Sequence, residues 1–167
     1  SSFPLRLTST VVRGFGRGST ELGIPTANLS REESSSTLSG EEFFDNLETG
    51  IYYGYAGITG TSKVYKAAIS IGYNPTYSNN IKTCEPHLIA NEADYRNKSS
   101  CGETQMPDFY GATLRLSVIE KIRDELPFES VEKLIIAIKN DIKITEEKLN
   151  EEGEEVKVER EWCLGES

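Results

Sequence analysis

Four glycines and a short Pro-Thr-Ala-Asn segment lie close together near the start of the chain. The glycines are Gly14, Gly16, Gly18 and Gly23, within the string GFGRGSTELGIPTAN. Glycine lets the backbone adopt positive φ and approach a ligand closely, and successive backbone N–H groups in such a loop can bind an anion. Arg17 adds positive charge to an otherwise acidic chain. This stretch therefore has the chemistry to bind phosphate groups.

The Pro-Thr-Ala-Asn segment, residues 25–28, adds candidate metal ligands. Thr26 and Asn28 carry neutral oxygen donors two residues apart, and residues at i and i+2 face the same side of an extended segment. Mg²⁺ prefers oxygen ligands and is commonly shared with substrate phosphates. One short stretch could therefore hold a nucleotide's phosphates together with their metal ion.

The glycine pattern alone does not identify a nucleotide-binding family. It is neither the G-x-x-x-x-G-K-[ST] pattern of P-loops nor the G-x-G-x-x-G pattern of dinucleotide-binding folds. A glycine-rich hairpin loop without a ligand would explain the glycines equally well.

A second candidate group is the carboxylate of Glu85, in the string KTCEPHLI. A carboxylate in a mostly apolar strand at the wall of a pocket can act as a general base. Taken alone, Glu85 also fits an ordinary glutamate of an edge strand, and the lone His87 fits a structural role.

Composition limits the class of protein. The 167 residues suit one domain, residues 1–167, and the net charge of −9 argues against nucleic acid as a partner, because binding a phosphate backbone needs a basic surface. A nucleotide is a different case, since Mg²⁺ and nearby arginines can offset the negative field. No apolar run approaches the length of a membrane span, so we expect no membrane partner.

Cysteine usage and the N-terminus bear on location. Three widely spaced cysteines without a CxxC motif argue against a disulfide framework and fit a reducing compartment. We therefore expect a cytoplasmic protein, with no signal peptide. Because the chain begins with Ser1, we expect that an N-terminal piece has been removed or left disordered, which leaves organellar targeting open.

The elements that must position these groups are mostly short strands. Strands are predicted at residues 5–12, 49–58, 64–72, 83–90 and 109–120, with a short extended piece at 24–29 and a hairpin joining 49–58 to 64–72. Gly54 and Gly57 indicate a bulge or a close backbone approach. Residues 121–128 are predicted as a charged turn.

A helix is expected to follow the strands. Apolar residues at steps of three and four predict it from an N-cap at Ser130 to about Leu149. Residues 151–164 are left undecided between helix and strand. The order of elements favours a small, mainly antiparallel barrel with a terminal helix.

Five sequence blocks resemble the riboflavin kinase (flavokinase) family. They are GFGRGSTELGIPTAN, TGIYYGYA, SIGYNPTY, KTCEPHLI and FYG, followed by the helix start SVEKLI, and together they cover about residues 11–149. The resemblance implies a mainly β fold, a six-stranded antiparallel Greek-key β-barrel with a C-terminal α-helix packed outside. It also implies transfer of the γ-phosphoryl group of ATP to the 5′-hydroxyl of riboflavin, which makes FMN and ADP.

The resemblance assigns roles to matching positions. Glu85 would accept the proton of the ribityl hydroxyl, Thr26 and Asn28 would bind Mg²⁺, with Zn²⁺ or Mn²⁺ as substitutes, and Arg123 would contact the flavin. The ATP phosphates would be bound by the loop residues Gly14, Phe15, Gly16, Arg17, Gly18, Gly23, Pro25 and Thr26. A monomer is expected.

Two departures from the family pattern stand out. The segment after the last strand reads IRDEL, with Asp124 where the family commonly has proline, which puts the stiffness of that segment in doubt. Residues 91–108 are longer than the family leads us to expect, and could cap a pocket or form a surface insertion.

Three other functions remain open at this point. A non-catalytic flavin-binding module would keep the barrel and lose the base or the metal ligands. The chain could also be the kinase part of a bifunctional protein that adenylylates FMN. The pattern GFGRGS…PTAN disfavours the related CTP-dependent kinase type.

Overall fold

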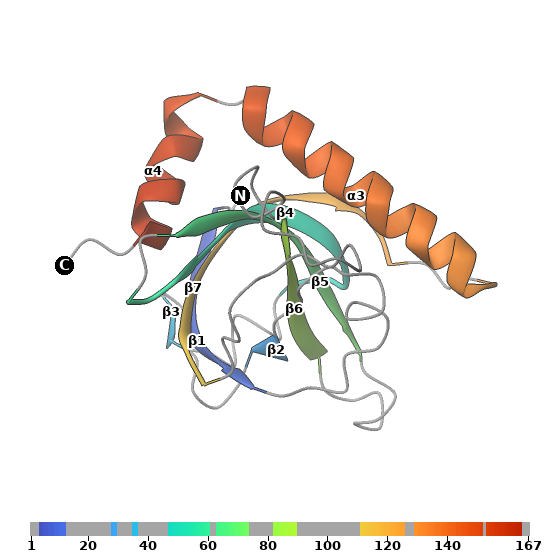
Figure 1. Ribbon diagram of the computed structural model, residues 1–167, viewed down its shortest axis with the longest axis horizontal. Coiled ribbons are helices and arrows are strands. Elements are labelled where there is room, and N and C mark those ends of the chain that lie inside the picture. The colour runs from blue at the N-terminus through green and yellow to red at the C-terminus, as the bar shows by residue number, and fades with distance from the viewer. Residues whose placement is uncertain are drawn as a thin grey trace, which may run out of the picture.

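The structure, a computed structural model, describes residues 4–12, 28–29, 35–36, 47–60, 63–73, 82–89, 111–125, 129–151 and 153–164. These residues form a curled sheet with two helices against its outer face (Figure 1). The strands are β1 (Leu5–Val12), β2 (Asn28–Leu29), β3 (Ser35–Ser36), β4 (Gly50–Ile58), β5 (Val64–Tyr73), β6 (Lys82–Ile89) and β7 (Thr113–Arg123). The helices are α3 (Val131–Glu151) and α4 (Glu154–Leu164).

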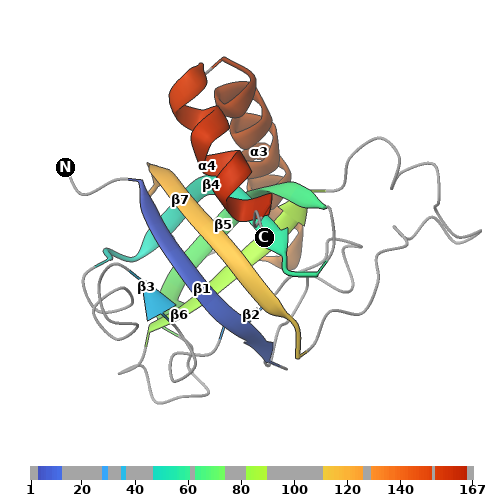
Figure 2. The ribbon, with the colours of Figure 1, turned by 90° about the vertical axis from the view of Figure 1, so that its left-hand side faces the viewer.

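All strand pairs are antiparallel. The order across the sheet is β2-β1-β7-β4-β5-β6, and β3 pairs with β1. Figure 2 shows β1 and β7 running side by side, in agreement with their register of Leu7 opposite Leu116. Strands β4, β5 and β6 follow one another, and β7 returns to lie beside β4, which is the Greek-key order.

The concave face of the sheet contains the larger hydrophobic core. Alternate residues of each strand point into it, as the two-residue period of a strand requires. Burying one such Leu or Ile side chain stabilises the fold by about 1.5–3 kcal/mol. The most deeply buried large members are Leu7, Val11, Tyr52, Tyr65, Ile69, Ile71, Leu88, Leu114 and Leu116.

The two helices cover part of the convex face. The helix α3 begins at Ser130, whose Oγ accepts a hydrogen bond from the backbone N–H of Lys133 at 3.2 Å, so the predicted N-cap is confirmed. A second hydrophobic cluster lies between the helices and the strands, built on Tyr53, Tyr55, Leu149, Val156 and Cys163. Neither described helix is both long and apolar enough to cross a membrane.

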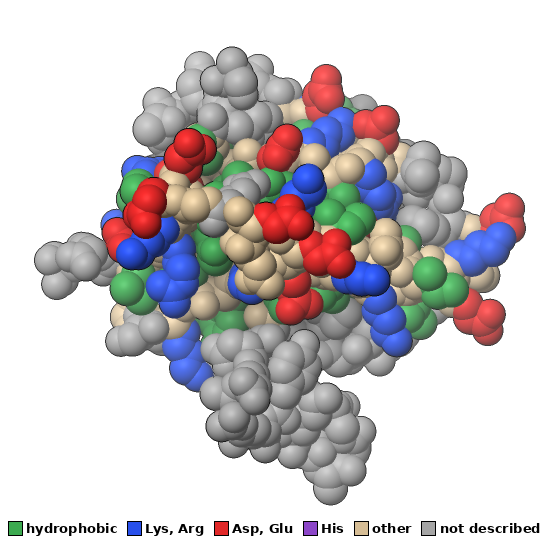
Figure 3. Space-filling view, turned by 90° about the horizontal axis from the view of Figure 1, so that it is seen from above, with side chains coloured by type: hydrophobic (Ala, Val, Ile, Leu, Met, Phe, Trp, Pro, Cys, Tyr) green, Lys and Arg blue, Asp and Glu red, His purple; other side chains and the backbone are tan. Residues whose placement is uncertain are grey.

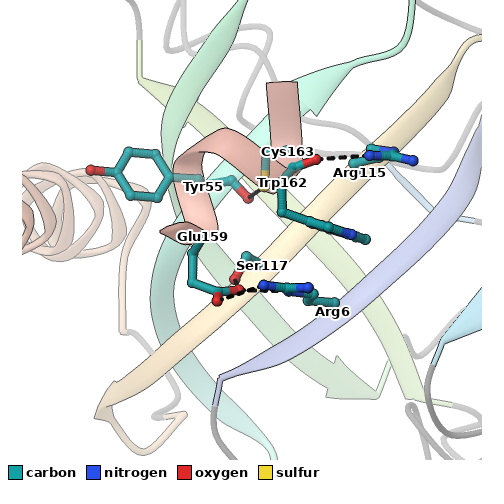
Figure 4. A network of polar contacts seen from close by, with 7 residues as sticks. All are labelled: Arg6, Tyr55, Arg115, Ser117, Glu159, Trp162 and Cys163. Carbon is teal, nitrogen blue, oxygen red and sulfur yellow. Dashed lines mark hydrogen bonds and ion pairs between the residues drawn. The ribbon is translucent and has the colours of Figure 1, made fainter. Parts of the chain in front are cut away.

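Polar contacts fasten α4 to β1 and β7 (Figure 4). Arg6 donates two hydrogen bonds to the Glu159 carboxylate, at 2.9 and 3.0 Å, and Ser117 Oγ donates a third at 2.7 Å. The guanidinium groups of Arg6 and Arg115 each lie 5.1 Å from the centre of the Trp162 ring, a distance at which cation–π attraction operates.

Glu159 is buried but remains ionised. Burial by itself raises the pKa of its carboxyl, whereas the hydrogen bonds from Arg6 and Ser117 and the positive charge of Arg6 lower it, and the net direction is downward. The fold therefore gains from the charged form of Glu159.

Two glycines of β4 allow close backbone contacts. A Cβ at Gly54 would overlap the carbonyl of Ser117 on β7, and one at Gly57 would overlap the carbonyl of Cys163 at the end of α4. The β4–β7 register also shifts between Tyr53 and Gly54. The predicted bulge and close approach are both confirmed.

The predicted strand count and helix count need correction. Among the described residues, five strands have eight or more residues, where six strands were predicted. Of the extended piece predicted at 24–29, residues 28 and 29 form β2, and residues 24–27 lie outside the described residues. The undecided residues 151–164 form the additional helix α4, and β7 extends to Arg123, into the segment predicted as a turn.

We predict that Glu159→Gln destabilises the protein by about 2 kcal/mol at pH 7, because hydrogen bonds to a charged group contribute about 1.5–3 kcal/mol. Since the pKa of Glu159 is lowered in the folded state, this stabilisation is present above the ordinary value of 4.5 and is lost as the pH falls through the folded-state pKa. Urea unfolding at pH 7 and in acid measures both effects.

Glu129→Gln is the matched control, because Glu129 forms an ion pair with Lys133 in which the two side chains are 83% and 61% exposed. Such exposed pairs contribute little. A Glu159→Gln variant as stable at pH 7 as Glu129→Gln would contradict the anchoring role of Glu159.

Candidate active site

A pocket of about 230 Å³ lies between the convex face of the sheet and α3. Strands β4, β5, β6 and β7 contribute one wall and the first half of α3 contributes the other. The described residues that line it are Ile51, Ala68, Ser70, Glu85, His87, Arg123, Glu125, Leu134, Ile138 and Asp141.

The strand period explains which side chains of β6 reach the pocket. Cys84 and Leu88 belong to the core on the concave face, so Glu85 and His87 point to the convex face. Their register partners on β5 are Ser70 and Ala68. These partners are small, which leaves space between the strands and α3.

The Glu85 carboxyl is half-buried in this pocket. Burial raises the pKa of Glu85, and the nearby negative charge of Glu125 raises it further. A carboxyl with a raised pKa is a stronger base than a solvated glutamate once it is ionised. Glu85 therefore has the properties of a general base.

Arg123 is held in place by α3. Its Nε and Nη2 donate hydrogen bonds to the two carboxylate oxygens of Asp141, both at 2.9 Å. Asp141 is 3% exposed, and its backbone carbonyl accepts a hydrogen bond from Thr145 Oγ1. This two-point pairing is geometrically specific and ties the end of β7 to the helix across the pocket.

His87 is uncharged at neutral pH. Burial lowers its pKa to about 4, although the negative charge of Asp141 acts in the opposite direction. Since His87 lies beside a carboxylate and remains neutral, it contributes shape and hydrogen bonding to the pocket rather than positive charge.

Ion pairs and one hydrogen bond surround the segment after β7. Asp124 contacts Lys121 Nζ at 2.6 Å, and Lys121 also contacts Glu48 at 3.1 Å. Arg123 Nη1 donates to the carbonyl of Asp124 at 3.0 Å. The ion-pair partners Glu48 and Asp124 are largely exposed, so these pairs contribute little to stability, and the contact to the backbone here is the one from Arg123.

The structure brings together two of the predicted site residues, Glu85 and Arg123. Asn28 lies in β2, where its backbone pairs with Val12, and its side chain is outside the described atoms. The predicted phosphate-loop residues all lie outside the described residues, as do residues 91–108: Gly14, Phe15, Gly16, Arg17, Gly18, Gly23, Pro25 and Thr26.

Sequence reasoning missed Asp141 and Glu125. A signal for Asp141 existed, because it follows Leu134 and Ile138 at the spacing of the apolar stripe, where a charged residue is unexpected. Glu125 has no periodic signal, but it stands where the resembling family segment, which usually reads Arg-Pro-Glu, has its glutamate. Among the described residues, no three His, Cys, Asp or Glu side chains cluster as metal ligands.

Comparison with known proteins identifies a family for this chain. The family model described as "Flavokinase: Riboflavin kinase" matches residues 1–149. Riboflavin kinase of Mus musculus is 40% identical over 153 residues, covering 89% of this chain and 83% of the mouse protein. Riboflavin kinase of Homo sapiens is 41% identical over 143 residues, covering 83% and 77%.

A solved structure supports the same fold. The crystal structure of riboflavin kinase from Trypanosoma brucei superimposes with a TM-score of 0.65 and 24% sequence identity. The match covers 100% of this chain and 92% of that one.

We predict that the stability of the protein falls as the pH drops from about 6.5 to about 4, and that His87→Gln reduces this fall. His87 is the single histidine of the chain, and its pKa is lowered from 6.5 to about 4 on folding. The unfolded chain therefore binds a proton that the folded protein does not, which corresponds to up to about 3 kcal/mol.

Urea unfolding at pH 7.5, 6 and 5 measures this difference, with wild type and variant compared at each pH. Parallel stability curves for the two proteins would show that His87 is not kept neutral by folding.

Proposed function

The chain belongs to the riboflavin kinase family, and we propose that it transfers the γ-phosphoryl group of ATP to the 5′-hydroxyl of riboflavin, making FMN and ADP. The observation that carries this proposal is the meeting of Glu85 and Arg123 in one pocket. They come from separate strands: Glu85 belongs to the block KTCEPHLI on β6, and Arg123 belongs to the segment IRDEL at the end of β7.

Glu85 is the proposed general base. A hydroxyl is a poor nucleophile until a base takes its proton. The pKa of Glu85 is raised, which makes its carboxylate a better proton acceptor at neutral pH than a solvated glutamate. In phosphoryl transfer the protein acts mainly by positioning and by electrostatic stabilisation. Glu85 would position the hydroxyl and accept its proton as the phosphoryl group is transferred.

Riboflavin has an apolar ring system and a polar ribityl chain, and the pocket offers groups for both. Ile51, Leu134 and Ile138 present apolar surface. Arg123, fixed by Asp141, presents a rigid hydrogen-bond donor to the flavin. We propose that the ring lies along α3 and that the ribityl chain points to Glu85.

Thr26 and Asn28 are the proposed ligands of Mg²⁺. Their neutral oxygens are a donor set that suits a hard cation shared with phosphates, and Mn²⁺ or Zn²⁺ could substitute. When bound, the metal ion neutralises charge on the phosphate oxygens. The glycine loop from Gly14 to Gly23 would cover the phosphates with its backbone N–H groups, and Arg17 would add positive charge.

The remaining proposals concern the setting of the reaction. We propose a cytoplasmic monomer with no nucleic-acid or membrane partner. Acidic and basic side chains are interspersed on the face that carries the helices (Figure 3), and the net charge of the chain is −9. Both observations support small-molecule substrates rather than a polyanion.

Purified protein incubated with riboflavin, ATP and Mg²⁺ should form FMN, which chromatography measures. Removal of divalent metal with EDTA should abolish the reaction. Restoring Mg²⁺ should restore it. Riboflavin binding without FMN formation would instead indicate a flavin-binding module.

Glu85→Gln should lower the turnover number by about two to four orders of magnitude, the usual contribution of a general base, while ATP binding changes little. The matched control is Glu146→Gln, on the exposed side of α3, which should keep wild-type turnover. Unchanged turnover in Glu85→Gln would remove Glu85 from the mechanism.

A further inference from the structure

The backbone conformation at Gly72, on β5, does not require a glycine. Gly72 is not one of the glycines with positive φ within the described residues, and glycine inside a strand is less favourable than alanine. The reason for the glycine is its neighbour. The three atoms nearest to a Cβ built at Gly72 all belong to Glu125: Oε1 at 2.5 Å, Oε2 at 2.9 Å and Cδ at 3.0 Å.

The carboxylate of Glu125 therefore occupies the space where a side chain at position 72 would lie. Glu125 lies two residues after the end of β7 and lines the same pocket as Glu85. The row of outward residues on β5 is Ala68, Ser70 and Gly72. Ser70, opposite Glu85, thus has a small side chain, and Gly72, the next outward residue of β5, has none. No large side chain of β5 therefore stands between the carboxylates of Glu85 and Glu125.

Of the ionisable groups that face Glu85, Glu125 is the one whose charge acts most on the Glu85 carboxylate. His87, on the same strand, is neutral above about pH 4. Arg123 from β7 and Asp141 from α3 are hydrogen-bonded to each other at both ends, so their charges largely offset. Within the described part of the chain, Glu125 is the one acidic group of the pocket besides Glu85 that has no ion-pair partner.

We propose that Glu125, seated in the space that Gly72 leaves open, is a positioning residue for the reaction: its carboxylate faces Glu85 across the pocket and sets the pH range in which Glu85 accepts a proton. The catalytic part of this inference rests on the proposed role of Glu85 as the base.

The electrostatics agree with this arrangement. After burial, the charge of Glu125 is the further cause that raises the pKa of Glu85. Burial also raises the pKa of Glu125, and the positive charge of Arg123 offsets only part of this effect, so the net direction is upward. A general base works best when its pKa is near the operating pH, and a second carboxylate moves Glu85 in that direction.

The test is a ¹³C NMR titration of the glutamate carboxyls in the folded protein, with the Glu85 signal identified by its loss in Glu85→Gln. In Glu125→Gln the titration midpoint of Glu85 should shift to lower pH, and Glu125→Asp, which keeps the charge, should restore part of the wild-type midpoint. Glu146→Gln, with the same change in net charge far along α3, should leave the midpoint unchanged.

Gly72→Ala tests whether the space beside Gly72 positions the Glu125 carboxylate. The atoms that the new methyl group meets are the end of a flexible side chain, so the variant should fold with the Glu125 carboxylate displaced and with the Glu85 midpoint shifted to lower pH. The control is Gly153→Ala, where a Cβ would meet no atom within 4 Å. The rising limb of FMN formation against pH should move in the same direction as the NMR midpoint in both pocket variants.

An unchanged Glu85 midpoint in Glu125→Gln would overturn the proposal. A shift in Glu125→Gln without one in Gly72→Ala would overturn the role of Gly72. Both outcomes are independent of the proposed function, because the NMR midpoint does not depend on catalysis. Failure of the wild-type protein to form FMN would instead refute the kinase assignment.

Discussion

Side chains on a β-strand point alternately to its two faces, and the candidate site depends on this constraint. On β6, Cys84 and Leu88 fill the core while Glu85 and His87 between them face α3. A shift of one residue in the register would bury the carboxylate in the apolar core and expose the apolar side chains. The same hydrophobic pattern that folds the sheet therefore also places the proposed base.

The pocket exists because α3 is held against a wall of small residues rather than packed into it. Ala68 and Ser70 on β5 provide little volume, and apolar residues of α3 stand opposite them. The Arg123–Asp141 pair fixes the helix at this end. Farther along, Leu149 of α3 and Val156 of α4 pack with Tyr53 and Tyr55. One part of the convex face is thus closed by packing, and the other part is left open for a ligand.

The sequence predicted local structure well and long-range pairing poorly. The strand at Leu5–Val12, the β4–β5 hairpin and the Ser130 cap follow from patterns within a few residues. The helix α4 was undecided because its stripe includes Glu159, a charge that is buried only because Arg6 lies 153 residues away. Glu85 was identified through its sequence block, whereas the contact between Glu125 and Gly72 spans β4, which lies between β7 and β5, and so depends on the folded sheet.

The two carboxylates of the pocket lower the stability of the folded protein, and the rest of the fold must offset this cost. Raised pKa values for Glu85 and Glu125 mean that ionising both opposes folding, and stability is lost as the pH rises above their ordinary range. Considering only this electrostatic effect, removing the charge of either Glu85 or Glu125 would stabilise the folded protein. The two carboxylates are therefore not explained by a contribution to stability. A proton acceptor needs such an environment, because a fully solvated carboxylate binds protons too weakly at neutral pH. The buried cluster on the concave face supplies the stability that makes this arrangement tolerable.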